Sequence, residues 1–123
     1  MTSLDHLKRR GNLVENEQRR SRGNDPLPRL LAQLMARAGE PATVEHATSR
    51  PWASALFQGR RHVITLHLTG PAAAERRVRF TDGLEDAEWT LPRHFVADIC
   101  VDAHRSIAGE EWIELSALTI EDW

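Results

Sequence analysis

HVITLHLTGPAAAERRVRFTDGL, residues 62–84, places a strand signal and a helix signal side by side. Over residues 62–69, apolar and polar side chains alternate, which is typical of a strand with one buried face. We expect the buried face to carry His62, Ile64, Leu66 and Leu68. Its opposite face then carries Val63, Thr65, His67 and Thr69.

A helix is predicted directly after this strand. Pro71 opens an alanine-rich stretch that ends near Gly83, and alanine favours helix formation whereas glycine readily terminates a helix. The alternative is a strand over residues 76–80, where apolar residues also alternate with arginines.

An earlier helix has clearer boundaries. Asp25 is a favourable N-cap, Pro26 suits the first helical position, and Gly39 can end the helix in a left-handed conformation. Between them an apolar stripe recurs at helical spacing, which predicts one buried face. The stripe consists of Leu27, Leu30, Leu31, Leu34 and Ala38.

The same succession of proline, glycine and proline occurs twice. The first set is Pro26, Gly39 and Pro51, and the second is Pro71, Gly83 and Pro92. This recurrence predicts a tandem α-β-β-β repeat. The predicted strands are residues 43–46, 52–57, 62–69, 88–91, 94–102 and 112–120, with a bulge near Ala117 or Leu118. We expect turns at residues 48–51 and 58–61 and a loop at residues 103–110.

These elements predict one α+β domain over residues 26–123, in the order α-β-β-β-α-β-β-β. A mostly antiparallel sheet of about six strands would have both helices on one face, giving two layers. A ferredoxin-like arrangement with fewer strands is the alternative. Residues 1–25 are too polar to pack and predict a mobile basic N-terminal arm.

Composition narrows the class of protein. The chain has 123 residues, one domain's length, and Cys100 is its only cysteine. It has no apolar run long enough to cross a bilayer and no secretory signal pattern, so we expect a cytoplasmic location. Arginine outnumbers lysine, as in GC-rich bacterial genomes, so we also expect a bacterial source. Residues 1–25 have a net charge of +2 and residues 26–123 of −4, which argues against a dedicated nucleic-acid binder.

Titratable side chains converge on one predicted surface, the sheet face opposite the helices. The candidates for binding there are His67, His94, Asp98, Cys100 and Glu114. Imidazole and carboxylate groups at close range can exchange a proton or bind a ligand. The simpler interpretation is a solvated polar sheet face, because His94 and Asp98 would lie about 13 Å apart along one strand.

Cys100 has two interpretations as well. A lone thiol beside a histidine can be a nucleophile, but a strand cysteine between apolar neighbours is more often a packed side chain. The six histidines show no metal-ligand spacing and the glycines form no phosphate-binding loop, so we predict no metal and no cofactor.

Trp52 and Trp112 are the remaining candidates, because a tryptophan ring is a frequent binding anchor. The alternative is that they cover the open edges of a small core. The terminal Trp123 would indicate a partner if exposed.

Three functions are compatible with these patterns. The leading hypothesis is a non-enzymatic accessory or interaction module, forming a homo-oligomer or binding a protein partner through a sheet edge or the mixed sheet face. The second is a small-molecule-binding protein or small enzyme that uses His67, His94 and Asp98. The third is weak nucleic-acid binding through the arginine-rich arm.

Overall fold

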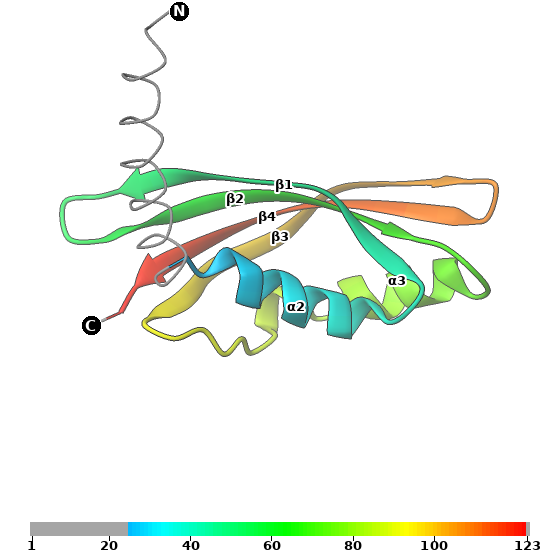
Figure 1. The fold of residues 1–123 in the computed structure, drawn as a ribbon, viewed down its shortest axis with the longest axis horizontal. Helices are drawn as coiled ribbons and strands as arrows, with labels where there is room; N and C mark the ends of the chain where they lie inside the picture. The colour runs from blue at the N-terminus through cyan, green and yellow to red at the C-terminus, as the bar shows by residue number, and fades with distance from the viewer. Residues whose placement is uncertain (1–24, 123) are drawn as a thin grey trace, which may run out of the picture.

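Two helices cover one face of a four-stranded antiparallel sheet in the computed structural model, which describes residues 25–122 (Figure 1). The elements are α2 (Leu27–Ala38), β1 (Ala42–Ala53), β2 (Gln58–Leu68), α3 (Ala73–Thr81), the 3-10 helix η1 (Leu84–Asp86), β3 (His94–Ile107) and β4 (Glu110–Glu121). The strands lie in the order β1-β2-β4-β3. Except for Asp25, the predicted basic arm lies outside the described residues, as does Trp123.

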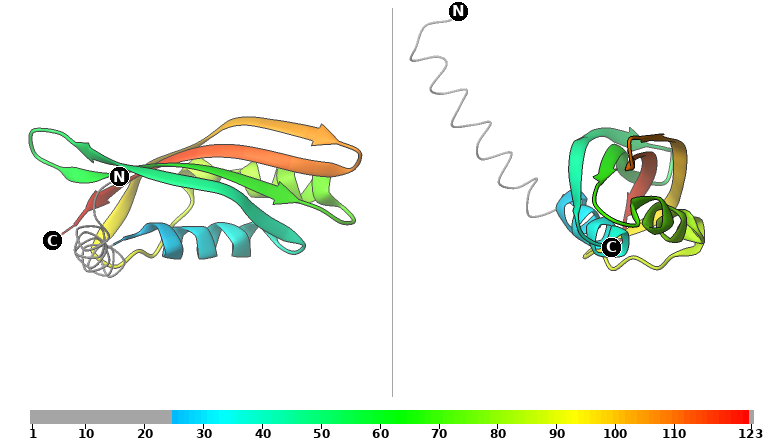
Figure 2. Two further views of the ribbon diagram at one scale, coloured as in Figure 1. Left: turned by 45° about the horizontal axis from the view of Figure 1, so that its top comes forward. Right: turned by 90° about the vertical axis from the view of Figure 1, so that its right-hand side faces the viewer.

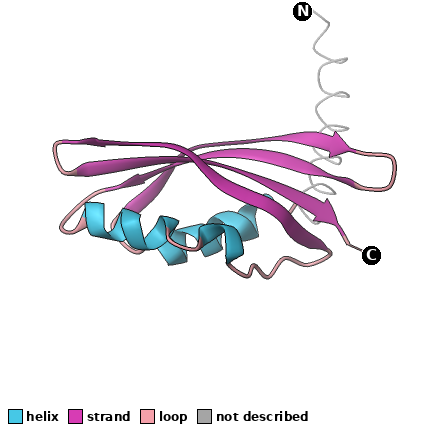
Figure 3. Ribbon diagram, turned by 180° about the vertical axis from the view of Figure 1, so that it is seen from behind, coloured by secondary structure: helices cyan, strands magenta, loops and turns pink. Residues whose placement is uncertain are grey.

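The core lies between the helices and the sheet. Figures 2 and 3 show both helices on the same side of the strands, so the predicted two-layer α+β architecture is confirmed. Even-numbered residues of β2 face the helices, as the alternation predicts, and odd-numbered residues of β4 join them. The core includes Leu30, Leu34, Ile64, Leu66, Leu68, Phe80, Ile113 and Leu115.

α2 begins and ends where its sequence predicts. The Leu27 amide donates a hydrogen bond of 3.0 Å to Asp25 Oδ1, which satisfies one of the free N–H groups of the first turn. Gly39 has a φ of 76° and its amide bonds to the Met35 carbonyl, so it ends the helix in a conformation that disfavours other residues.

The second helix prediction is also correct, and the alternative strand over residues 76–80 is wrong. α3 buries Ala73 and Phe80, and Leu84 is buried one turn later in η1. Val78 points outward and is 54% exposed. Arg76 takes the buried position beside Ala73.

The prediction of about six strands is wrong, because two predicted strands merge and one does not form. β1 continues through the turn predicted at residues 48–51, with Ser49 paired opposite His62. Pro51 is tolerated there because β1 is an edge strand, on which one amide needs no partner. The hairpin turn lies at residues 54–57 instead of 58–61, closed by the Ser54 amide and the Phe57 carbonyl at 2.8 Å.

The predicted strand at residues 88–91 makes only an isolated bridge between Leu91 and His94. Its backbone pairs with a side chain of α2 instead of a strand. The Gln33 amide accepts a hydrogen bond from the Thr90 N–H at 2.9 Å and donates one to the Thr90 carbonyl at 2.9 Å. The Gln33 side-chain amide therefore takes the place of the neighbouring strand that a strand at residues 88–91 would need.

β3 and β4 are longer than predicted, because the loop expected at residues 103–110 is a two-residue turn. Ala108 and Gly109 have positive φ values of 52° and 81°, the conformation of a tight hairpin turn. An alanine at positive φ is uncommon, so the sequence carried no clear turn signal there.

The bulge predicted near Ala117 or Leu118 lies in the neighbouring strand. β4 keeps a regular register with β2, whereas β3 has extra residues at Ala97 and Asp102. β1 has one at Glu45. The bulges are therefore on the two edge strands, and the tandem α-β-β-β repeat is not confirmed.

Candidate functional site

The sheet face that no helix covers, here called the helix-free face, is a grid of side chains from all four strands. Residues directly opposite each other in an antiparallel sheet point to the same side, so the register defines rows across the face. We name four of them by their residues. These are the stacked row (Thr43, His67, Trp112, Arg105), the cysteine row (Thr48, Val63, Ser116, Cys100), the arginine row (Arg50, Arg61, Leu118, Asp98) and the end row (Trp52, Gly59, Ile120, Phe95).

In the stacked row, the indole ring of Trp112 contacts the side chains of His67 and Arg105. The His67 ring stacks on it with centroids 4.3 Å apart and planes 9° apart. From β3, on the other side of β4, the Arg105 guanidinium carbon lies 4.8 Å from the indole centroid. Neighbouring strands therefore use both sides of this ring, which leaves less of it for a ligand.

His67 also has an acidic neighbour. Its Nε2 lies 3.1 Å from Glu110 Oε1, close enough for an ion pair when the imidazole is protonated. Glu114 lies between the stacked and cysteine rows, opposite Thr65 and Ala103, and is exposed. It lines a shallow hollow of about 100 Å³ with Trp112 and Arg105.

Cys100, Asp102 and Ser116 form a small polar triangle. The Ser116 hydroxyl donates to Asp102 Oδ1 at 3.2 Å, and the Cys100 thiol lies 3.5 Å from both oxygen atoms. Asp102 lies two residues after Cys100, so ordinary strand alternation directs both side chains to the same side, although Asp102 is the extra residue of a bulge. No histidine within the described residues hydrogen-bonds to this thiol.

The structure does not bring the predicted polar residues together. His94 lies on the helix side of the sheet, opposite Glu121, and its Nδ1 lies 2.9 Å from the Pro92 carbonyl oxygen. The extra residue at Ala97 shifts the alternation of side chains along β3. His94 therefore points to the helix side, whereas Asp98 remains on the helix-free face with Cys100. For the same reason Phe95 lies on the helix-free face, where it is 42% exposed.

Trp52 is half-buried at the end row, directly opposite Gly59. A side chain at position 59 would clash with the β4 backbone, because a β-carbon there would lie 2.0 Å from the Thr119 carbonyl oxygen. Gly59 therefore allows β2 and β4 to approach closely where the face carries Trp52, Phe95 and the buried Ile120.

On the helix side, His62 is a buried polar residue, so its predicted position on the buried face of this strand is confirmed. Its Nδ1 lies 2.5 Å from the Ser49 hydroxyl and its Nε2 lies 2.9 Å from the Thr119 hydroxyl. Since Thr119 donates its own proton to the Arg60 carbonyl, it accepts from Nε2–H, and Ser49 donates to Nδ1. Burial is the main reason that the pKa of His62 is lowered from 6.5 to about 4.

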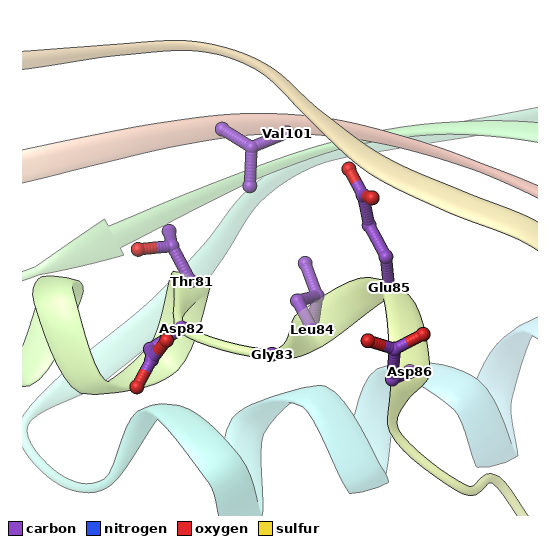
Figure 4. Close-up of a pocket in the computed structure, with 7 residues that line it drawn as sticks. All are labelled: Thr81, Asp82, Gly83, Leu84, Glu85, Asp86 and Val101. Atoms are coloured by element: carbon purple, nitrogen blue, oxygen red, sulfur yellow. The ribbon is translucent and has the colours of Figure 1, made fainter.

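Two further hollows lie near the ends of the fold. One, of about 350 Å³, is lined by residues 81–86 and Val101, and Figure 4 shows the Asp82 carboxylate pointing away from Val101. The other, of about 480 Å³, is lined by exposed Leu56, Phe57 and Phe95. Within residues 25–122, no three His, Cys, Asp or Glu side chains are grouped so that they could hold a metal ion.

The sequence patterns did not predict the arginine row. Arg50 and Arg61 lie directly opposite each other, and Asp98 lies two strands from Arg61. None of the three makes an ion pair with another residue in the described range. Arg61 belongs to the predicted hairpin, but the turn was predicted at residues 58–61, which placed Arg61 in a loop instead of a strand.

No protein-family model matches the chain, and no curated protein is significantly similar to it. Among solved structures, one chain of the virion of a native gene transfer agent particle is similar, with a TM-score of 0.45 and 18% sequence identity. The similarity covers 70% of this chain and 71% of that chain. None of the helices in the described part of the chain is both long and apolar enough to span a membrane.

Proposed function

We propose that the protein is a non-enzymatic interaction module that self-associates through its helix-free face. The observation that carries this proposal is the combination of exposed apolar and unpaired charged side chains on that face. Val63 is 45% exposed at its centre and Phe95 is 42% exposed in the end row. Arg50 and Asp98 lie in the arginine row, between the row of Val63 and the row of Phe95. Neither makes an ion pair with another described residue.

The edges of the sheet are less suitable for association than its face. A flat edge strand offers unpaired backbone groups to another chain, but bulges twist and interrupt such an edge. β1 has one bulge and Pro51, and β3 has two bulges. We therefore favour the face over the edge.

The placement of the polar candidates also supports binding over catalysis. His94 and Asp98 point to opposite sides of the sheet, and His67 stacks on Trp112. The Cys100 thiol has weak contacts with Ser116 and Asp102, neither of which is a good base for activating it.

Sedimentation over a wide concentration range tests this proposal. We expect the wild-type protein to form an oligomer, and Val63→Asp to dissociate it because a charge would be buried in the interface. Val78→Asp is the matched control, since Val78 is a similarly exposed valine on the outer surface of α3. A wild-type protein that is monomeric at every concentration would refute the proposal, as would equal effects of the two substitutions.

A further inference from the structure

The charged side chains of the arginine row make no ion pairs with other described residues, which favours contact with another molecule. Arg50 and Arg61 are directly opposite on β1 and β2, and like charges at such positions repel each other. Their row ends in Asp98 on β3, which is exposed, and the position between Arg61 and Asp98 is the apolar Leu118. The row is therefore basic at one edge of the sheet and acidic at the other.

From this charge distribution and the strand order we infer that the partner is a second copy of this chain, bound face to face by a two-fold axis that runs along the strands between β2 and β4. This inference rests on the proposed self-association and specifies its geometry. In the order β1-β2-β4-β3, such an axis exchanges β1 with β3 and β2 with β4 while keeping each row at its own level.

The outer positions of the arginine row and of the end row are complementary under this operation. Arg50 of one copy meets Asp98 of the partner subunit, and the same contact occurs again by symmetry. In the end row, Trp52 meets Phe95 of the partner subunit, which covers two large rings that are partly exposed in the monomer. Near the axis, Val63 meets Ser116 of the partner subunit, so its exposed side chain becomes buried.

The alternative axis, running across the strands, lacks this match. It would reverse the order of the rows and keep each strand over its own counterpart, so β1 would lie over β1. The arginines would then face other side chains of β1 and β2, where the described residues offer only Glu45 as an acid, and Glu45 lies in the bulge.

The area of the face is sufficient for a specific dimer. Four strands spaced about 4.8 Å apart and five rows spaced about 6.8 Å apart cover on the order of 600 Å² per copy. Two copies would bury on the order of 1,200 Å², at the lower end of specific protein interfaces.

Charge reversal tests the arrangement through the Arg50 and Asp98 contacts. Arg50→Asp alone places two aspartates at each of two symmetric contacts, and Asp98→Arg alone places two arginines there. We expect each variant to weaken self-association at least about tenfold, because like charges at an interface are costly. An equimolar mixture of the two variants should form a heterodimer in which both contacts are attractive, and the double variant Arg50→Asp/Asp98→Arg should recover homodimerisation.

The matched controls are Arg79→Asp and Asp86→Arg, which reverse exposed charges on α3 and η1. Native mass spectrometry with one variant carrying a mass tag distinguishes heterodimers from homodimers, and circular dichroism checks folding. The inference is overturned if the single variants associate like wild type, or if neither the mixture nor the double variant recovers association. A monomeric wild-type protein refutes the proposed function itself, so the two failures are distinguishable.

A cross-link provides a test that does not depend on charge. In the cysteine row, Thr48 of one copy would meet Cys100 of the partner subunit, whereas the two Cys100 residues would lie at opposite edges. Thr48→Cys should therefore give covalent dimers with a short thiol cross-linker, and the wild type and Thr48→Cys/Cys100→Ser should not. Covalent dimers of the wild type at the same yield would contradict this geometry.

Discussion

His62 shows how a single buried residue links stability to pH. Its imidazole is fully buried, and both ring nitrogens are satisfied by hydroxyl groups of Ser49 and Thr119. Its pKa is lowered to about 4, mainly by burial; the charge of Asp25 opposes this shift, and the charges of Arg60 and His94 contribute to it. The neutral ring is therefore part of the folded state, whereas the unfolded chain binds a proton at a pKa near 6.5.

We predict that acid destabilises the protein through His62. Between pH 6.5 and about 4 the unfolded chain holds a proton on His62 that the folded protein does not, so unfolding takes up a proton. This contribution to stability is complete above pH 6.5 and decreases as the pH falls, by up to about 1.4 kcal/mol per pH unit. Urea unfolding of the wild type and His62→Asn at several pH values measures it.

We expect a steeper loss for the wild type than for His62→Asn over this range. If the variant does not fold, the His62 ring signals in the NMR spectrum of the wild type provide the check. A ring that becomes protonated near pH 6.5 in the folded protein would contradict the prediction.

At the level of the helices, two arginines connect α2 and α3. Arg37, in the last turn of α2, donates hydrogen bonds to the Phe80 and Asp82 carbonyls at the end of α3. Arg76 of α3 donates in return to carbonyls at the end of α2, just before β1 and just after β2. The acceptors of Arg76 are Ala38 at 3.3 Å, Gly39 at 3.0 Å, Thr69 at 2.7 Å and Pro41 at 2.8 Å.

Replacing Arg76 should therefore cost more stability than its position on a short helix implies. A guanidinium can bond to four carbonyls at once, whereas the lysine ammonium has three donors and a different shape. We predict that Arg76→Lys lowers the free energy of unfolding by about 2–4 kcal/mol, because buried carbonyls lose their donors. Arg79→Lys, on the exposed side of the same helix, should change it by less than about 0.5 kcal/mol.

Urea unfolding monitored by tryptophan fluorescence measures both variants. Equal stabilities of Arg76→Lys and Arg79→Lys would show that the four carbonyls do not depend on the guanidinium.

The elements that were predicted correctly have strong local signals. α2 has an N-cap, a helical stripe and a terminal glycine, and α3 has its alanine run and Gly83. The errors occurred where a distant residue supplies the partner. Thr90 pairs with the Gln33 side chain, and β1 stays extended at Pro51 because it pairs with β2 on one side only.

At the scale of the whole molecule, self-association should be visible in the melting temperature. A dimer formed only by folded chains stabilises them by mass action, so the melting temperature should rise with protein concentration. We predict this rise for the wild type and Val78→Asp but not for Val63→Asp. Differential scanning calorimetry over a hundredfold concentration range measures it, and a wild-type melting temperature that is constant over that range would argue against a dimer.

The candidate site was predictable only in part. Alternation along β2 and β4 correctly placed His67 and Glu114 on the helix-free face, since these strands have no bulge. On β3 the same reasoning also placed Asp98 and Cys100 on this face correctly, but it failed for His94, because the extra residue at Ala97 moves His94 to the helix side. A bulge has no reliable sequence signature, and it reverses the side on which all preceding residues of its strand point.

Residue patterns alone were thus enough to predict two amphipathic helices, an antiparallel sheet and a single two-layer α+β fold, because hydrophobic periodicity and helix ends depend on neighbours along the chain. The number of strands, the rows of the helix-free face and the pairing of Arg50 with Arg61 arose only on folding. Each of these depends on strand register, and register is set by contacts between residues that are far apart in the chain.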